Sequence, residues 1–242
     1  MVPAAPSGDD AAPLLLYFHG GGYFQGSPRT HRALAAALAG RAGMAARVPD
    51  YRLAPEHPFP AAPEDARALY LGLLAAGLRP GRIVLAGDSA GGGLALALLH
   101  VIGAEGLPWP AATVVFSPWT DLTVSGESVR TNAGADPLLP ASRLADVGAA
   151  YLAGADARDP RASPLFGQFA GAPPTLIQAS RHEILRDDSV RMAGVLRDQG
   201  VDVTLELSDR LPHVWQIFQG RLPEADAALD RAGAFLRAHL HS

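Results

Sequence analysis

Cysteine and lysine are both missing from this chain of 242 residues. The absence of cysteine excludes disulfide bonds, thiolate metal sites and a cysteine nucleophile. Because all 20 basic residues are arginine, the sequence also excludes a P-loop lysine, a Schiff-base lysine and a serine-lysine dyad. No Gly-x-Gly-x-x-Gly fingerprint occurs, which disfavours a nucleotide-dependent enzyme.

Strong net charge and long apolar runs are lacking as well. The formal charge of -4 gives no electrostatic reason to expect nucleic acid or an anionic membrane as a partner, so we expect a small molecule. The longest apolar run, residues 94–99, is far short of a membrane span, and residues 1–12 have neither a basic start nor an apolar core. We therefore expect a soluble, unexported and cytoplasmic protein.

The most informative stretch is Gly87-Asp88-Ser89-Ala90-Gly91. It follows the apolar run of residues 82–86 and precedes a helix-like apolar segment. A serine on a sharp turn between strand and helix has a strained backbone and an exposed hydroxyl, and glycines two residues before and after it leave room for close packing. This pattern predicts a nucleophile elbow with Ser89 as the nucleophile.

Strand-like and helix-like segments alternate along the rest of the chain. We expect strands at residues 14–18, 44–49, 82–86, 112–116, 175–179 and 201–207, and helices at residues 30–41, 61–76, 140–154, 187–200 and 222–240. Residues 123–139 show no clear period. Such alternation implies right-handed crossovers and a mostly parallel sheet of about six strands flanked by helices, in a single α/β domain covering residues 1–242.

A glycine cluster, Gly20-Gly21-Gly22, comes directly after the first predicted strand and His19. Consecutive glycines can turn their backbone amides into a site without obstruction by side chains, as an oxyanion hole requires. Alone, the cluster also fits a flexible loop.

A serine nucleophile needs a base and an acid, and in this kind of fold the order along the chain is serine, acid, histidine. Three histidines follow the last plausible acid loop: His213, His239 and His241. We favour His213, because it lies between a strand and a helix, at the edge of the sheet where strands end.

The acid should lie in the loop after the strand at residues 175–179. Glu183 comes first there and is the preferred acid, with Asp187 as the alternative. Asp187 and Asp188 stand where aspartate caps or charges the start of a helix, so a structural role also explains them.

Several motifs together resemble the bacterial hormone-sensitive lipase family of α/β hydrolases, over residues 14–242. They are His19-Gly20-Gly21-Gly22, Asp50-Tyr51-Arg52-Leu53-Ala54-Pro55-Glu56, Gly87-Asp88-Ser89-Ala90-Gly91-Gly92, Ser117-Pro118-Trp119, Asp159-Pro160-Arg161-Ala162-Ser163-Pro164 and Glu183-x-Leu185-x-Asp187-Asp188. The resemblance implies that the amides of Gly21, Gly22 and Ala90 form the oxyanion hole. It also implies a structural role for His19, and supports Glu183 as the acid.

The expected function is hydrolysis of short-chain acyl esters by a serine carboxylesterase, with no metal and no organic cofactor. An amidase or lactonase with the same triad remains an alternative, as does a non-catalytic small-molecule receptor on the same fold. We expect a shallow pocket formed by Tyr23, Phe24, Trp119 and Trp215, with little apolar wall for a long chain. Trp119 could equally be a core residue.

The sequence departs from the family in one respect. Members usually carry two strands and cap helices ahead of the histidine-glycine motif, and here only 18 residues precede His19. We therefore expect the N-terminal cap and first two strands to be missing, and the strand at residues 44–49 to be a sheet edge. Either a neighbouring subunit, as in a homodimer, would shield this edge, or Met1 is not the true start. A lid formed by residues 1–13, or an interior strand at 44–49, would contradict this expectation.

Overall fold

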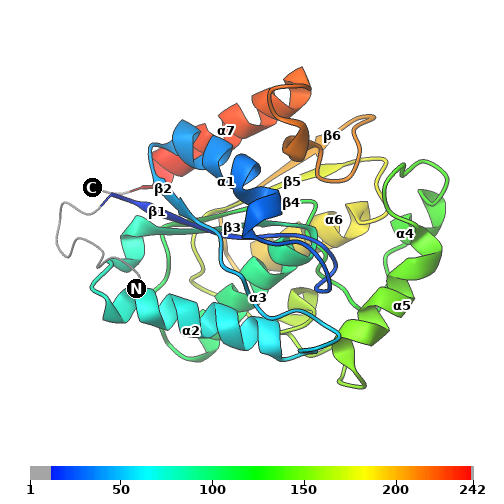
Figure 1. Cartoon of the computed structure of the whole chain (residues 1–242), viewed down its shortest axis with the longest axis horizontal. Helices are drawn as coiled ribbons and strands as arrows, with labels where there is room; N and C mark the ends of the chain where they lie inside the picture. Colours follow the sequence, from blue (N-terminus) through cyan, green and yellow to red (C-terminus); the bar gives the residue numbers. More distant parts are fainter. Residues whose placement is uncertain (1–11, 241–242) are drawn as a thin grey trace.

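The computed structural model describes residues 12–240, which form one parallel six-stranded sheet flanked by helices (Figure 1). The strand order β2-β1-β3-β4-β5-β6 confirms the expected α/β hydrolase arrangement and places β2 at an edge. The strands are β1 (Leu14–Phe18), β2 (Ala45–Arg47), β3 (Ile83–Asp88), β4 (Ala112–Phe116), β5 (Thr175–Ser180) and β6 (Val203–Ser208).

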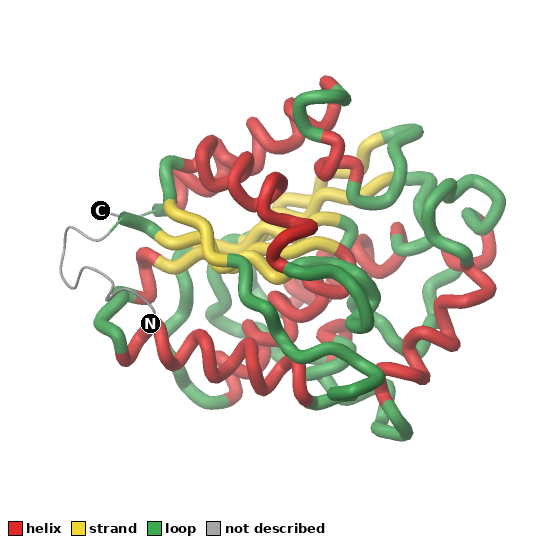
Figure 2. The backbone as a smooth tube through the Cα atoms, in the orientation of Figure 1, coloured by secondary structure: helices red, strands yellow, loops and turns green. Residues whose placement is uncertain are grey.

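Helices cover both faces of the sheet, as Figure 2 shows in its colouring by secondary structure. One face carries α1 (Pro28–Ala42) and α7 (Pro223–His239), and the other carries α2 (Ala61–Ala75), α3 (Ser89–Ala104) and α6 (Arg186–Asp198). The alternation of β1 explains both cores: Leu15 and Tyr17 pack toward α1 and α7, whereas Leu16 and Phe18 pack toward α2 and α3.

The segment between β4 and β5 contains α4 (Ser128–Thr131) and α5 (Ala141–Leu152). The expected helix at residues 140–154 is therefore present, and α4 is a short addition within a stretch that shows no sequence period. Among the described residues, no helix has both the length and the apolar character needed to cross a membrane.

Helix α1 begins two residues before the expected start because of its cap. The side chain of Ser27 accepts a hydrogen bond from the amide of Thr30, and the Thr30 hydroxyl accepts one from the amide of Ser27. This reciprocal pair satisfies amides that have no partner inside the helix, and Pro28 fits the first helical position.

The register of the sheet brings the ends of four strands into line. Phe18 pairs with Gly87, Asp88 pairs with Phe116, and Phe116 pairs with Gln178. The loops that follow β1, β3, β4 and β5 consequently leave the same edge of the sheet side by side. A lid formed by residues 1–13, which would contradict the expected absence of a cap, falls almost wholly outside the described residues.

Candidate active site

Ser89 lies at the junction of β3 and α3 with φ of 51°, in the left-handed region that a residue with a side chain rarely adopts. The flanking glycines are required by contact distances. A Cβ on Gly87 would lie 2.4 Å from the carbonyl oxygen of Gly91, and one on Gly91 would lie 2.1 Å from that of Phe18. The turn therefore has the tight strand-to-helix geometry of a nucleophile elbow.

In the loop after β1, glycines occupy positions where a side chain would be strained or would clash. Gly21 and Gly22 have φ of 122° and 65°, and a Cβ on Gly21 would lie 2.2 Å from the carbonyl oxygen of Gln25. Ala90 is the second residue of α3, so its amide lacks an acceptor within the helix. His19 is buried and stacks on Tyr51 with ring centroids 4.4 Å apart, consistent with a structural role.

His213 lies in the loop between β6 and α7, where its Nδ1 is 3.1 Å from Oε2 of Glu183. Both side chains are buried. A carboxylate at Nδ1 holds the imidazole in the tautomer that leaves Nε2 free to accept a proton. The structure thus brings together the histidine and the glutamate that the sequence singles out.

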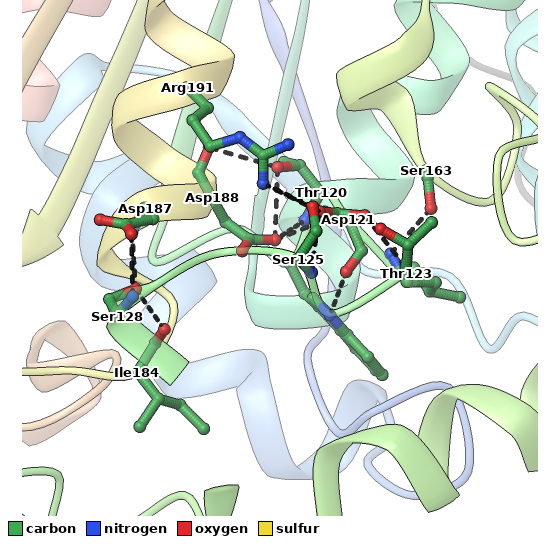
Figure 3. Close-up of polar contacts among 12 residues, drawn as sticks. Thr120, Asp121, Thr123, Ser125, Ser128, Ser163, Ile184, Asp187, Asp188 and Arg191 are labelled. Carbon is green, nitrogen blue, oxygen red and sulfur yellow. Dashed lines mark hydrogen bonds and ion pairs between the residues drawn. The ribbon is translucent and has the colours of Figure 1, made fainter. Parts of the chain in front are cut away.

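The alternative acid has other partners. One carboxylate oxygen of Asp187 accepts the amide of Ser128 at 2.8 Å (Figure 3). The other accepts Nε of Arg186 at 2.9 Å. Burial alone would raise the pKa of Asp187. The hydrogen bonds from Arg186 and Ser128 outweigh burial and hold this pKa below its usual value.

Asp188 is fully buried and faces the loop after β4 (Figure 3). Its Oδ2 accepts the amides of Thr120 at 2.7 Å and Asp121 at 2.9 Å. Burial raises the pKa of Asp188 to about 7; the charge of Asp121 also raises it, whereas the two amides lower it. The residue joins α6 to this loop, and its carboxylate is hydrogen-bonded to Thr120 and Asp121.

The remaining candidate bases lie elsewhere. His239 is in the last turn of α7, with Nδ1 2.8 Å from the carbonyl oxygen of Phe235, and His241 lies outside the described residues. Within residues 12–240, no group of three histidine or acidic side chains could hold a metal ion.

Sequence reasoning missed the role of Ser117. This residue directly follows β4, has φ of 46°, and its hydroxyl donates to Oε2 of Glu183 at 2.7 Å. The same hydroxyl accepts the amide of Val214 at 3.2 Å. The position of Ser117 at the end of a central strand could have indicated that it lies near the site. Its partners could not be read from the local sequence, because Glu183 and Val214 are 66 and 97 residues away along the chain.

A cavity of about 520 Å³ lies above the carboxyl ends of the strands. Its floor includes Ser89, Gly21, Gly22 and His213, so the proposed nucleophile, base and oxyanion loop share one space. The wall is mainly apolar, although Gln25 and Arg143 also line it. Its apolar residues come from α5 and the segment before it, and from the loops after β5 and β6: Leu138, Leu139, Pro140, Leu144, Val147, Leu185, Val214 and Ile217. This wall is more extensive than the sequence led us to expect.

The four expected pocket aromatics divide into two pairs. Phe24 and Trp119 line the cavity. Tyr23 and Trp215 do not: Tyr23 is buried against Tyr151 with ring centroids 3.9 Å apart, and Trp215 packs with Ala225 under α7. Left-handed backbone at Tyr23, and at Val214 before Trp215, turns these side chains into the core.

The chain is similar in sequence and fold to known proteins. A family model described as the alpha/beta hydrolase fold matches residues 15–217. The chain is 47% identical over 223 residues to an acetyl-hydrolase of Streptomyces hygroscopicus, covering 92% of this chain and 75% of the relative. A crystal structure of an esterase from the bacterial hormone-sensitive lipase family matches with a TM-score of 0.93 and 46% identity, over 99% of this chain and 79% of that one.

EstE5, whose crystals were soaked with p-nitrophenyl butyrate, matches with a TM-score of 0.92 and 44% identity, over 99% of this chain and 80% of that one. The chain belongs to the bacterial hormone-sensitive lipase family of α/β hydrolases.

Proposed function

We propose that the protein is a serine carboxylesterase that hydrolyses short-chain acyl esters. The observation that carries this proposal is the shared cavity, in which Ser89 and His213 lie beside the glycine loop, with Glu183 directly behind the histidine. The names of its relatives, acetyl-hydrolase and esterase, support the same reaction class.

In the proposed reaction, Oγ of Ser89 attacks the ester carbonyl while Nε2 of His213 takes the hydroxyl proton. The amides of Gly21, Gly22 and Ala90 stabilise the tetrahedral oxyanion, and Glu183 stabilises the imidazolium. His213 then gives its proton to the leaving alcohol. Water, deprotonated by His213, attacks the acyl-enzyme, and collapse of the second intermediate releases the carboxylic acid and restores Ser89.

The size and shape of the cavity favour esters with short acyl chains over esters with long ones. Its volume of about 520 Å³ is within the usual range for small-molecule sites, and α5 closes one side with apolar side chains. We propose that Phe24 and Trp119 contact the substrate, and that the chain acts as one hydrolase domain with a minimal cap. The homodimer and the cytoplasmic location stay predictions.

An amidase or lactonase would use the same acyl-enzyme chemistry, whereas a receptor would not turn over ester. We would measure hydrolysis of p-nitrophenyl acetate, butyrate, octanoate and palmitate, together with p-nitroacetanilide and γ-butyrolactone. We expect the acetate and butyrate esters to be the best substrates. Faster cleavage of the anilide or the lactone would favour one of the alternatives.

The variants Ser89→Ala and His213→Ala should each reduce turnover on the order of a thousandfold or more, and the double variant should lose little beyond that. Ser142→Ala is the matched control, because it removes an exposed hydroxyl from the first turn of α5. Retention of near-full esterase activity by Ser89→Ala would show that the proposed mechanism is wrong.

A further inference from the structure

The carboxylate of Asp88 is buried immediately before the nucleophile, and the proposed triad does not use it. The residue ends β3, is 3% exposed and lies against the cavity. A carboxylate in such a place requires several hydrogen-bond donors, so its partners indicate what it holds in position.

Three segments supply those partners. Oδ1 of Asp88 accepts the hydroxyl of Tyr17 on β1 at 2.8 Å and the amide of Gly20 at 3.1 Å. Oδ2 lies 3.4 Å from Nε2 of His31 on α1. One side chain thus joins β3, β1, α1 and the start of the glycine loop.

The electrostatics keep these partners in place. Burial and the neighbouring Asp88 carboxylate raise the pKa of Tyr17 well above its usual value, so the phenol remains a donor. Burial lowers the pKa of His31, but the hydrogen bond and charge of Asp88 outweigh burial and raise it. Nδ1 of His31 is also fixed, 2.8 Å from the hydroxyl of Thr30.

The contact between Asp88 and Gly20 leaves no room for a side chain at position 20. A Cβ on Gly20 would lie 2.2 Å from Oδ2 of Asp88, so the carboxylate packs directly on the backbone of the loop. The next two residues are Gly21 and Gly22, whose amides we assign to the oxyanion hole. Asp88 is also the residue directly before Ser89 in the chain, so it links the nucleophile to the glycine loop.

We propose that Asp88 is a positioning residue that sets the distance between the nucleophile and the oxyanion hole. The inference rests on the proposed function. Oxyanion donors act only when they lie about 2.7 to 3.1 Å from the developing charge, so a small displacement of Gly21 and Gly22 weakens binding of the transition state more than binding of the ester. Loss of the Asp88 contacts therefore lowers kcat and leaves KM nearly unchanged.

The test compares Asp88→Leu with Asp88→Asn. Leucine has a similar size and accepts no hydrogen bond, so kcat for p-nitrophenyl butyrate should fall about a hundredfold, comparable to loss of one oxyanion donor. Asparagine keeps an oxygen for Tyr17 and Gly20, and its amide group can donate to neutral His31, so it should recover most of the lost kcat. The affinity for butylboronic acid, a tetrahedral analogue, should fall in parallel with kcat.

A milder variant covers the case in which Asp88→Leu does not fold. Tyr17→Phe removes one donor to Asp88, and we expect a three- to tenfold decrease in kcat with KM unchanged. Tyr70→Phe is the control, because it removes a tyrosine hydroxyl that donates to the carbonyl oxygen of Pro108, away from the site. Thermal unfolding of each variant separates a loss of fold from a loss of positioning.

The outcomes distinguish this inference from the proposed function. A wild-type protein without esterase activity would contradict the proposed function. An active wild type together with folded Tyr17→Phe and Asp88→Leu variants of unchanged kcat would overturn the role of Asp88. A rise in KM with unchanged kcat in these variants would overturn it too, because it would indicate a ground-state effect.

Discussion

The hydroxyl of Ser117 lies 2.7 Å from Oε2 of Glu183, the same oxygen that faces Nδ1 of His213 at 3.1 Å. Because this hydroxyl also accepts the amide of Val214, one serine connects the proposed acid with the backbone next to the proposed base. Ser117 thereby fixes the orientation of both groups.

The first prediction concerns this serine. In Ser117→Ala, Glu183 loses one donor and the Val214 amide loses its acceptor, so we expect kcat to fall about tenfold and stability to fall by about 1 to 3 kcal/mol. Ser163→Ala is the control: its buried hydroxyl accepts the amide of Leu122, and its loss should affect stability only. Equal kcat values for the two variants would contradict the role of Ser117.

The second prediction separates Glu183 from Asp187. Glu183→Gln should retain the fold and lower kcat on the order of a thousandfold, because an amide can hold the wrong imidazole tautomer. Asp187→Asn weakens the contacts with Ser128 and Arg186 at the start of α6, and should cost about 0.5 to 2 kcal/mol with little change in kcat. Kinetics and urea unfolding of both variants check this, and the reverse pattern would assign the acid to Asp187.

The third prediction concerns the wall of the cavity. Val147 lies on α5, and its Cγ1 would be 3.1 Å from a Cβ on Gly22, so its side chain narrows the space beside the glycine loop. Val147→Ala should raise kcat/KM for the hexanoate ester relative to the acetate ester about three- to tenfold, since each buried methylene contributes about 0.8 kcal/mol. Val190→Ala, a change at an exposed valine on α6, should leave this ratio unchanged. An unaltered ratio in Val147→Ala would exclude this wall as the determinant of chain length.

The fourth prediction follows from the pKa of Asp188, which burial raises to about 7. In the unfolded chain an aspartate titrates at about 3.9, so between these two values the folded protein holds a proton that the unfolded chain has lost. Stability from this group is therefore complete below about pH 4 and falls as pH rises toward 7, by up to ~1.4 kcal/mol per pH unit. Asp188→Asn should remove this slope.

Urea unfolding at pH 5, 6, 7 and 8 measures this effect. Asp187→Asn is the matched control, because the pKa of Asp187 is lowered and its contribution is lost only as pH falls below about 4. Parallel stability curves for the wild type and Asp188→Asn between pH 5 and 7 would refute the prediction.

Much of the fold and the central residues of the site could be predicted from the sequence, because both depend on local sequence patterns. Apolar runs followed by glycine or histidine identified β1 and β3, and the order of Ser89, Glu183 and His213 selected the groups that the structure brings together. The edge position of β2 was also confirmed.

What the sequence did not reveal depends on distant contacts. The partners of Asp88 include Tyr17, 71 residues away, and nothing in the local pattern around either residue indicates the other. Trp215 follows the proposed base closely, yet a left-handed residue at Val214 directs it into the core. The apolar wall of α5 was missed because no local pattern shows which helix face lies over the strand ends.

The two edges of the sheet differ in length. Strand β2 has 3 residues, about 10 Å of backbone, and β6 has 6 residues, about 20 Å. A second copy of the chain that continued the sheet would therefore gain more backbone hydrogen bonds along β6 than along β2. Glu206 on this strand is already paired with Arg231 at 2.9 Å, so its charge is compensated within the chain and does not oppose such pairing. The longer edge is therefore the one along which strand pairing between copies would be more favourable, and the short β2 offers little backbone to pair with.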